Sequence, residues 1–360
     1  MTKQEIILNF DPSQPGLADA TIFGLPFTAE QSKIIIIPVP WEVTVSYGAG
    51  ASEGPAAIFE ASFQVDLCHQ EFPELWKLGI YFDAAPEHWH SNSNAYKALA
   101  QPIIKTLENG EDLANFPDLE SDLEKINKAC RNLHTEVCQR TQYWINQGKK
   151  VILLGGDHST PLGYYEALAS QHQNFGILHL DAHMDLRIAY EGFTYSHASI
   201  MYNALKIENI SKIVQVGIRD FCQQEVDNFI AQNGRVIVHT DSDLKASTYE
   251  GIYWKQQCDT IINELPQKVA ISFDIDGLQP WYCPNTGTPV PGGLAFEQAT
   301  YLFNKLAISD KQIIGIDLVE VAPGTTHDWD GNVGARMLFH LCGIFAKNSG
   351  LNVGERINFN

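Results

Sequence analysis

Residues that could bind metal ions follow three apolar segments of the sequence. Glycines and an acidic residue lead to a histidine in VILLGGDH, and two further groups of acids follow in ILHLDAHMD and AISFDID. Together they supply four carboxylates and two imidazoles: His158, Asp181, His183, Asp185, Asp274 and Asp276. Four carboxylates packed together would repel one another and raise their own pKa values. Two divalent cations would balance those charges, so the set predicts a centre with two metal ions.

The three groups are expected to meet at one edge of a sheet. In extended backbone, every second side chain projects to the same side, so Asp181, His183 and Asp185 should converge, as should Asp274 and Asp276. Open α/β sheets place their ligands at the carboxyl ends of the strands. Many oxygen ligands, two nitrogens and no thiolate favour Mn²⁺ over a structural zinc ion, with Ni²⁺ and Co²⁺ left open.

The elements that must position these residues can be read from the alternation of short apolar runs with longer helical patterns. Several runs are apolar throughout, as in strands buried on both faces of a parallel sheet. The alternation predicts an α/β protein, a single domain over residues 1–360 with three α/β/α layers and a mostly parallel sheet of about eight strands. The expected strands cover residues 33–37, 77–82, 151–154, 175–180, 212–216, 235–238, 268–273 and 312–319.

The clearest helix is expected over residues 121–147. Ser121 with Glu124 three residues later forms a capping-box pattern, and Gly148 offers a stop. Shorter helical patterns follow Ser159, Tyr195 and Leu294. Residues 84–120 have weak periodicity and mixed charge, so we expect an insertion or a lid-like excursion there.

Composition limits the partners of the chain. Its 360 residues include 24 Lys and Arg against 43 Asp and Glu, a net charge of −19. This excess disfavours nucleic acids and anionic membranes, and it is compatible with a small cationic substrate. No apolar run approaches the roughly 20 residues of a membrane span, and the N-terminus has no secretory pattern. Seven cysteines without a C-x-x-C pair suit reduced thiols, and we expect a cytoplasmic protein.

The motifs together resemble the arginase/agmatinase/formimidoylglutamase (ureohydrolase) family. The resemblance covers about residues 34–345 and implies the arginase-like fold, two Mn²⁺ ions per chain, a small guanidino or formimino substrate and a homo-oligomer, a trimer or hexamer. It rests on GGDHS at 155–159, DAHMD at 181–185, SFDIDGL-x-P at 272–280, TGTPVPGG at 286–293 and EVAP at 320–323.

The resemblance also implies a role for each metal-binding residue. His158 and Asp185 would bind one ion, and His183 and Asp276 would help to bind the other. Asp181 and Asp274 would bridge or contact both. The two ions would hold a hydroxide, available at neutral pH, that attacks the central carbon of the guanidinium or formimino group.

Two further residues match catalytic positions of the family. Glu320 would hold the guanidinium through charge-assisted hydrogen bonds, and His197 would carry protons to the leaving amine. His179, two residues before Asp181, either supports the metal ligands or is a core histidine with its own partners. His88 and His90 have no evident carboxylate partners, so a loop role is favoured for both.

The sequence departs from the family pattern near the site. Gln279 stands where family members usually have an aspartate that is not one of the six ligands. After Asp185, the chain lacks the loop residues by which arginases hold the head of arginine. Arg187 could meet a substrate carboxylate there, and Glu191 an amine. Arginine, agmatine, guanidinobutyrate, guanidine and formiminoglutamate all stay open as substrates.

The leading hypothesis is therefore a Mn-dependent hydrolase of C–N bonds in a guanidino compound, which releases urea and an amine. A formimidoylglutamase that releases formamide is the first alternative. A catalytically impaired, metal-free binding protein, in which Gln279 accompanies lost chemistry, is the second. A deacetylase-like hydrolase with one metal ion is disfavoured. A site for one ion needs fewer carboxylates than this sequence supplies once Asp274 and Asp276 are included.

Overall fold

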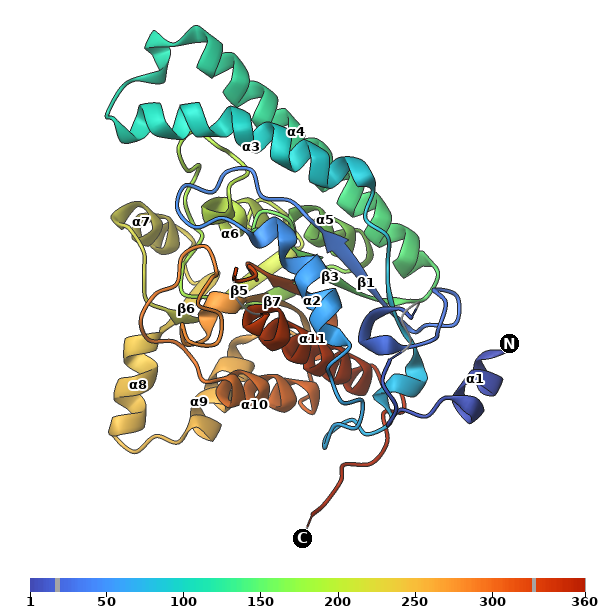
Figure 1. The fold of residues 1–360 in the computed structure, drawn as a ribbon. Helices are drawn as coiled ribbons and strands as arrows, with labels where there is room; N and C mark the ends of the chain where they lie inside the picture. Colours follow the sequence, from blue (N-terminus) through green and yellow to red (C-terminus); the bar gives the residue numbers. More distant parts are fainter. Residues whose placement is uncertain (17–19, 326–327, 360) are drawn as a thin grey trace.

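The computed structural model describes residues 1–16, 20–325 and 328–359, and eight parallel strands form its central sheet (Figure 1). The strand order is β2-β1-β3-β8-β7-β4-β5-β6. All eight predicted strands are confirmed, namely β1 (Ile34–Val39), β2 (Ile80–Phe82), β3 (Lys150–Gly155), β4 (Phe175–Leu180), β5 (Ile210–Ile218), β6 (Val236–Thr240), β7 (Lys268–Asp274) and β8 (Gln312–Val319). The prediction is furthest off at β2, because Leu75–Leu78 form a 3-10 turn before it.

Each central strand is buried on both of its faces. In β1, Ile34 and Ile36 belong to one hydrophobic core, whereas Ile35 and Ile37 belong to a second core on the opposite face. Successive side chains of a strand point to opposite faces, so a continuous apolar run fills two cores at once. This explains why the strands lack an apolar–polar alternation, and it confirms the three-layer prediction.

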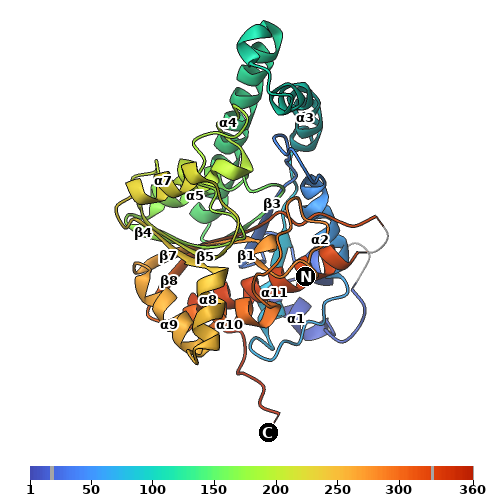
Figure 2. The ribbon, with the colours of Figure 1, turned by 90° about the vertical axis from the view of Figure 1, so that its left-hand side faces the viewer.

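Helices cover both faces of the sheet (Figure 2). A short helix, α1 (Lys3–Asn9), precedes the first strand. One layer comprises α3 (Glu87–Glu108), α4 (Pro117–Asn146), α5 (Leu162–Gln171), α6 (Ile200–Ala204) and α7 (Gln223–Ala231). The other comprises α2 (Gly54–Ser62), α8 (Asp241–Tyr249), α9 (Trp254–Glu264), α10 (Phe296–Ala307) and α11 (Trp329–Asn348). The three shorter helical patterns correspond to α5, α6 and α10.

The long helix α4 begins four residues before the predicted cap. Its first residue is Pro117, and Ser121 lies inside the helix, so the capping-box prediction is wrong. Proline suits the first helical position, because its fixed φ is already helical and its missing N–H would have no partner there. The predicted end is confirmed: the helix stops at Asn146, and Gly148 takes a φ of 71°.

Residues 84–120 are mostly helical rather than irregular. They form α3 and the start of α4, and these two helices run antiparallel as a hairpin that extends beyond the sheet (Figures 1 and 2). His88 and His90 lie on α3, so the loop interpretation of these residues is wrong. Each also has a carboxylate partner, because His88 Nε2 lies 2.7 Å from Glu136 and His90 Nε2 lies 2.7 Å from Glu53.

Over the described residues, the structure holds no helix that combines the length and the apolar character needed to cross a membrane.

Candidate active site

Four neighbouring strands carry the predicted site residues. In the sheet, β3, β8, β7 and β4 lie side by side in this order. His158 follows β3, Glu320 follows β8, Asp274 ends β7 and Asp181 follows β4. Because the strands are parallel, their carboxyl ends meet at one edge of the sheet, and the residues that follow them are brought together there.

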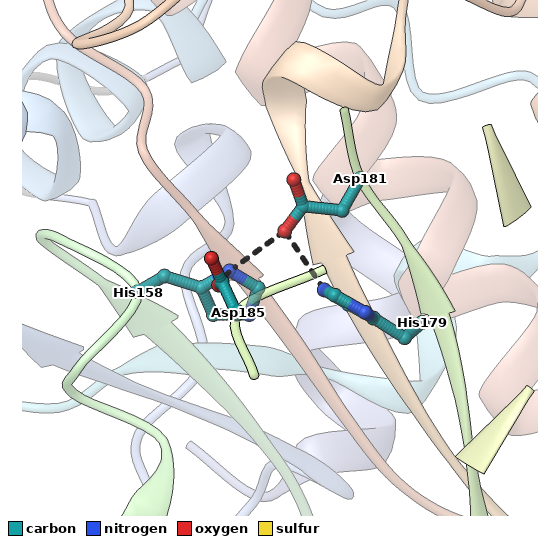
Figure 3. A group of neighbouring side chains, drawn as sticks. All are labelled: His158, His179, Asp181 and Asp185. Atoms are coloured by element: carbon teal, nitrogen blue, oxygen red, sulfur yellow. Dashed lines mark hydrogen bonds and ion pairs between the residues drawn. The ribbon is translucent and has the colours of Figure 1, made fainter. Parts of the chain in front are cut away.

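The first cluster surrounds one ring nitrogen of His158. Its Nδ1 atom lies 3.1 Å from Asp181 Oδ2, 3.1 Å from Asp185 Oδ2 and 3.3 Å from Asp274 Oδ2. Three of the residues involved are drawn in Figure 3, together with His179. The Nδ1 atom is buried, yet it makes no hydrogen bond of acceptable geometry. A buried nitrogen that faces three carboxylate oxygens without bonding to them fits a metal ion as the missing partner.

A second cluster shares Asp181 with the first. His183 Nδ1 lies 3.4 Å from Asp181 Oδ1 and 3.1 Å from Asp276 Oδ2. Asp181 therefore presents one oxygen to each cluster. Asp181, His183 and Asp276 can offer ligand atoms that all lie within 4.8 Å of one another, as can the group around His158. Two adjacent groups joined by one carboxylate are what a pair of metal ions requires.

The convergence is as predicted, but extended backbone is not its cause. Strand β4 ends at Leu180, and Asp185 adopts a left-handed conformation with φ 56°, which turns the chain back toward His158. Asp276 lies in a single 3-10 turn whose first N–H groups need acceptors, and Asp274 Oδ1 accepts from the Asp276 N–H at 2.9 Å. Tight turns at the strand ends, rather than continued strands, therefore aim these side chains.

Burial and mutual repulsion favour the protonated form of two of the acidic groups, Asp185 and Asp274. Burial and the charge of Asp181 raise the pKa of Asp185 to about 7. Burial, Asp276 and Asp181 raise the pKa of Asp274 well above its ordinary value. Burial lowers the pKa of His183, but Asp276 and Asp181 outweigh it and raise this pKa to about 12. Two divalent cations would take the place of these protons.

A buried network fixes the ring of His158. Its Nε2 atom lies 2.9 Å from Ser272 Oγ, and Ser272 donates to Asp317 Oδ1 at 2.9 Å. Tyr165 donates to the other oxygen of Asp317, also at 2.9 Å. If Nε2 donates to Ser272, Nδ1 keeps its lone pair for a metal ion. This network is not predicted by the sequence motifs, although an aspartate inside the buried strand QIIGIDLV is a signal that a polar partner must lie nearby.

Glu320 is a buried carboxylate beside the first cluster. One oxygen, Oε1, accepts from the His158 N–H at 2.7 Å. The other faces Gly287, where an added β-carbon would lie 3.6 Å from it, so this glycine leaves space next to the carboxylate. Burial and the charges of Asp274 and Asp157 raise the pKa of Glu320 well above its ordinary value. A bound cation would favour the ionised form.

His197 opens the short 3-10 turn before α6, and it is half-buried. Burial, together with the charges on His183 and His158, lowers its pKa to about 4. The imidazole is therefore neutral near pH 7 and can accept a proton. Its predicted role in proton transfer stays a prediction.

Arg187 and Glu191 belong to the loop between Asp185 and His197. The Arg187 guanidinium lies 4.8 Å from the centre of the Tyr190 ring, and its Nε lies 3.8 Å from Glu225. Glu191 has a φ of 52° and a buried Oε2 atom without a hydrogen-bond partner. Whether either residue contacts the substrate stays a prediction.

The hairpin of α3 and α4 holds this loop from outside the sheet. Asn127 of α4 donates to the carbonyl of Gly192 at 3.3 Å and accepts from the Thr194 N–H at 2.8 Å. Leu123 packs against Gly192, where an added β-carbon would lie only 2.8 Å from its side chain. The hairpin therefore fixes the course of the loop.

Gln279 continues the turn that carries Asp276. Its backbone N–H donates to the carbonyl of Leu294 at 2.9 Å, and within the described residues its side chain makes no hydrogen bond. The side chain is thus not needed to hold the turn.

Comparisons with known proteins bear on both the fold and the site. The model of the Arginase family matches residues 32–343. An N(1)-aminopropylagmatine ureohydrolase from Synechocystis is 29% identical over 293 residues, 81% of each chain. An agmatinase from Neisseria meningitidis is 29% identical over 292 residues, 80% of this chain and 79% of that protein. The solved structure of proclavaminate amidino hydrolase from Streptomyces clavuligerus has a TM-score of 0.71 at 22% identity, over 93% of this chain and 100% of that chain.

The all-parallel α/β/α architecture is thus an arginase-like fold. Because the family model covers most of its length, this chain belongs to the arginase family. It is a hydrolase that acts on C–N bonds of linear amidines, and the substrates of the family are small guanidino compounds.

Proposed function

We propose that this protein hydrolyses a guanidino compound with a cationic amine at its far end, such as agmatine or an N-substituted agmatine, with two Mn²⁺ ions bound at the site. The products are urea and the free amine. The observation that carries the proposal is the pair of residue groups that share Asp181, with His158 Nδ1 facing three carboxylate oxygens.

Six side chains would hold the ions. Their four carboxylates balance the four positive charges of two divalent cations, and their donor set of oxygens and imidazole nitrogens suits Mn²⁺. When bound, such ions lower the pKa of water and supply a nucleophile at neutral pH. His158 and Asp185 would hold one ion, His183 and Asp276 would help to hold the other, and Asp181 and Asp274 would contact both.

Glu320 would orient the substrate. Its Oε2 atom lies beside Gly287, which has no side chain to cover it, and its carboxylate has no Lys or Arg partner within the described residues. A guanidinium group would supply that positive charge, and two of its N–H groups donating to the Glu320 carboxylate would fix its orientation. The central carbon would then face the ligand cluster, because Oε1 of the same carboxylate is tied to the backbone of His158.

His197 would move the proton. Water that adds to the guanidinium carbon must lose a proton, and the amine that leaves must gain one. The neutral imidazole of His197 can accept the first proton and deliver the second.

The preference for an amine-bearing substrate rests on two supports. Two relatives are named for agmatine or aminopropylagmatine, both of which carry an amine beyond the guanidino group. The net charge of −19 also favours a cation over an anionic compound such as formiminoglutamate. No observation specifically favours the release of formamide.

A substrate panel tests the proposal. The purified protein is incubated with Mn²⁺ and with agmatine, aminopropylagmatine, arginine, guanidinobutyrate, guanidine or formiminoglutamate, and urea, ammonia and formamide are measured. We expect urea with the amine-bearing compounds at a rate at least about tenfold above arginine. Formamide as the sole product, or no turnover of any compound by protein with two bound Mn²⁺, would refute the proposal.

A matched pair of variants ties the activity to the site. Asp276→Asn removes one charge from the second cluster and should abolish most turnover. Asp122→Asn removes the same charge from an exposed pair with Lys125 on α4, and we expect unchanged activity. Assembly into a trimer or hexamer stays a prediction, which analytical ultracentrifugation can test.

A further inference from the structure

His179 lies against the first ligand cluster. It is fully buried in β4, and its Nε2 atom lies 2.8 Å from Asp181 Oδ2 (Figure 3). Its ring nitrogen also lies close enough to His158, Asp181 and Asp185 to serve as a ligand to the same ion. The question is whether His179 binds metal or holds a residue that does.

The answer depends on which ring nitrogen carries the proton, and Gln215 decides this. Residues His179 and Gln215 are paired in register on strands β4 and β5. Gln215 Nε2 lies 2.7 Å from the carbonyl oxygen of Met184, which can only accept a hydrogen bond. The atom that faces this carbonyl must therefore be the amide nitrogen, since the opposite orientation would place two oxygens together.

The second hydrogen of that amide points to His179. Gln215 Nε2 lies 2.9 Å from His179 Nδ1, so Nδ1 accepts and carries no proton. In a neutral imidazole the proton then resides on Nε2, which donates to Asp181 Oδ2. A ring nitrogen that carries a proton has no lone pair to offer a metal ion.

We propose that His179 is a positioning residue for Asp181 rather than a metal ligand, and that Gln215 sets its tautomer. This inference rests on the proposed metal centre. Asp181 is the carboxylate that the two clusters share, so its orientation decides which oxygen faces His158 and which faces His183. The N–H of His179 holds the carboxylate in this orientation, and the chain from Met184 through Gln215 keeps that N–H in place.

The tautomer can be measured in the absence of metal. In ¹⁵N-histidine-labelled full-length protein stripped of metal, long-range ¹H–¹⁵N correlation spectra distinguish the two neutral forms, and loss of one signal set in His179→Gln assigns it. We expect the proton on Nε2 of His179. A proton on Nδ1 would overturn the proposal, whatever metal the protein binds.

Metal binding by variants provides the second readout. His179→Leu removes the donor, whereas His179→Gln keeps an N–H close to the position of Nε2. We expect both to bind two Mn²⁺ ions per chain, with affinity about 10- to 100-fold weaker in the leucine variant and largely restored in the glutamine variant. Free Mn²⁺ measured by electron paramagnetic resonance gives both the stoichiometry and the affinity.

The controls separate positioning from packing and from the proposed function. His340→Leu changes another buried histidine, on α11, and should lower the thermal midpoint without weakening Mn²⁺ binding. Loss of one of the two ions in His179→Leu would make His179 a ligand and overturn the proposal, as would an unchanged affinity. If the unaltered protein binds no Mn²⁺, the proposed function fails, while the tautomer experiment still tests the role of Gln215.

Discussion

Asp274→Asn separates the charge of the site from its fold. Asp274 Oδ2 lies 3.3 Å from His158 Nδ1, and Asp181 Oδ2 lies 3.1 Å from the same atom, so the two oxygens are at most 6.4 Å apart, the sum of these distances. At an effective dielectric constant of about 20, two unit charges at that distance repel by at least about 2.6 kcal/mol. Burial and this repulsion raise the pKa of Asp274 well above its ordinary value, which favours the protonated carboxyl group in the metal-free protein.

Asparagine imitates that protonated form. It keeps the Oδ1 acceptor for the Asp276 N–H, so the free energy of unfolding of the metal-free protein should change by less than about 1 kcal/mol. With Mn²⁺ bound, however, one of four compensating charges is missing. We expect kcat to fall at least about 100-fold, equivalent to about 2.7 kcal/mol, at saturating Mn²⁺ and substrate.

The assays are urea release by the loaded enzyme and thermal unfolding of the metal-free protein, with Asp122→Asn as the control. Retention of more than half of the activity would refute the role of Asp274. A collapse of the metal-free fold would refute the argument that the carboxyl group is already neutral there.

Three further predictions follow from the same geometry. Glu320→Gln keeps the acceptor for the His158 N–H but removes the negative charge that would pair with a guanidinium. We therefore expect kcat/KM to fall about 10- to 100-fold while the affinity for Mn²⁺ stays unchanged. Weaker binding of Mn²⁺ would contradict this prediction. The pKa of Asp185 is raised to about 7 in the metal-free protein, so Mn²⁺ must displace its proton at pH 6. We therefore expect the affinity for Mn²⁺ to rise from pH 6 to pH 8, with proton release on binding. Isothermal titration calorimetry in buffers of different ionisation enthalpy measures both, and an affinity that does not change with pH would contradict this prediction. Gln279→Asp should keep the thermal midpoint of unfolding within about 2 °C of the unaltered protein, because the Gln279 side chain makes no hydrogen bond within the described residues. A large drop in the midpoint would show that the glutamine side chain holds the turn.

The sheet was predictable from the sequence because its strands are continuous apolar runs that end at glycine, proline or acidic residues. Helix boundaries were less predictable. Ser121 has the residue types of a cap, yet Pro117 starts the helix earlier, and Leu119 of that additional turn packs against the hydrophobic core. Residues 84–120 gave a weak pattern because much of α3 is exposed and few of its residues face the core.

The six proposed ligands were recognisable because metal-binding residue types lie at the ends of three strands, β3, β4 and β7. The partners behind them were not. Ser272 and Asp317 lie on different strands and meet only through the register of β7 against β8, which pairs them directly. Gln215 meets His179 by the same kind of pairing between β4 and β5. Local sequence carries the turns and the ligand types, whereas these contacts depend on long-range strand order.

The tether between Asn127 and the loop before His197 fastens this loop at a point away from the proposed ligands. The six proposed ligands lie at or just after the ends of β3, β4 and β7, whereas the middle of the loop is fastened to a helix that stands outside the sheet. Substitutions of Leu123 or Asn127, which contact the loop, would change its course without replacing any proposed ligand. If this loop lines the substrate site, as we propose for Arg187 and Glu191, substrate preference would change through the hairpin while the proposed ligands keep their positions.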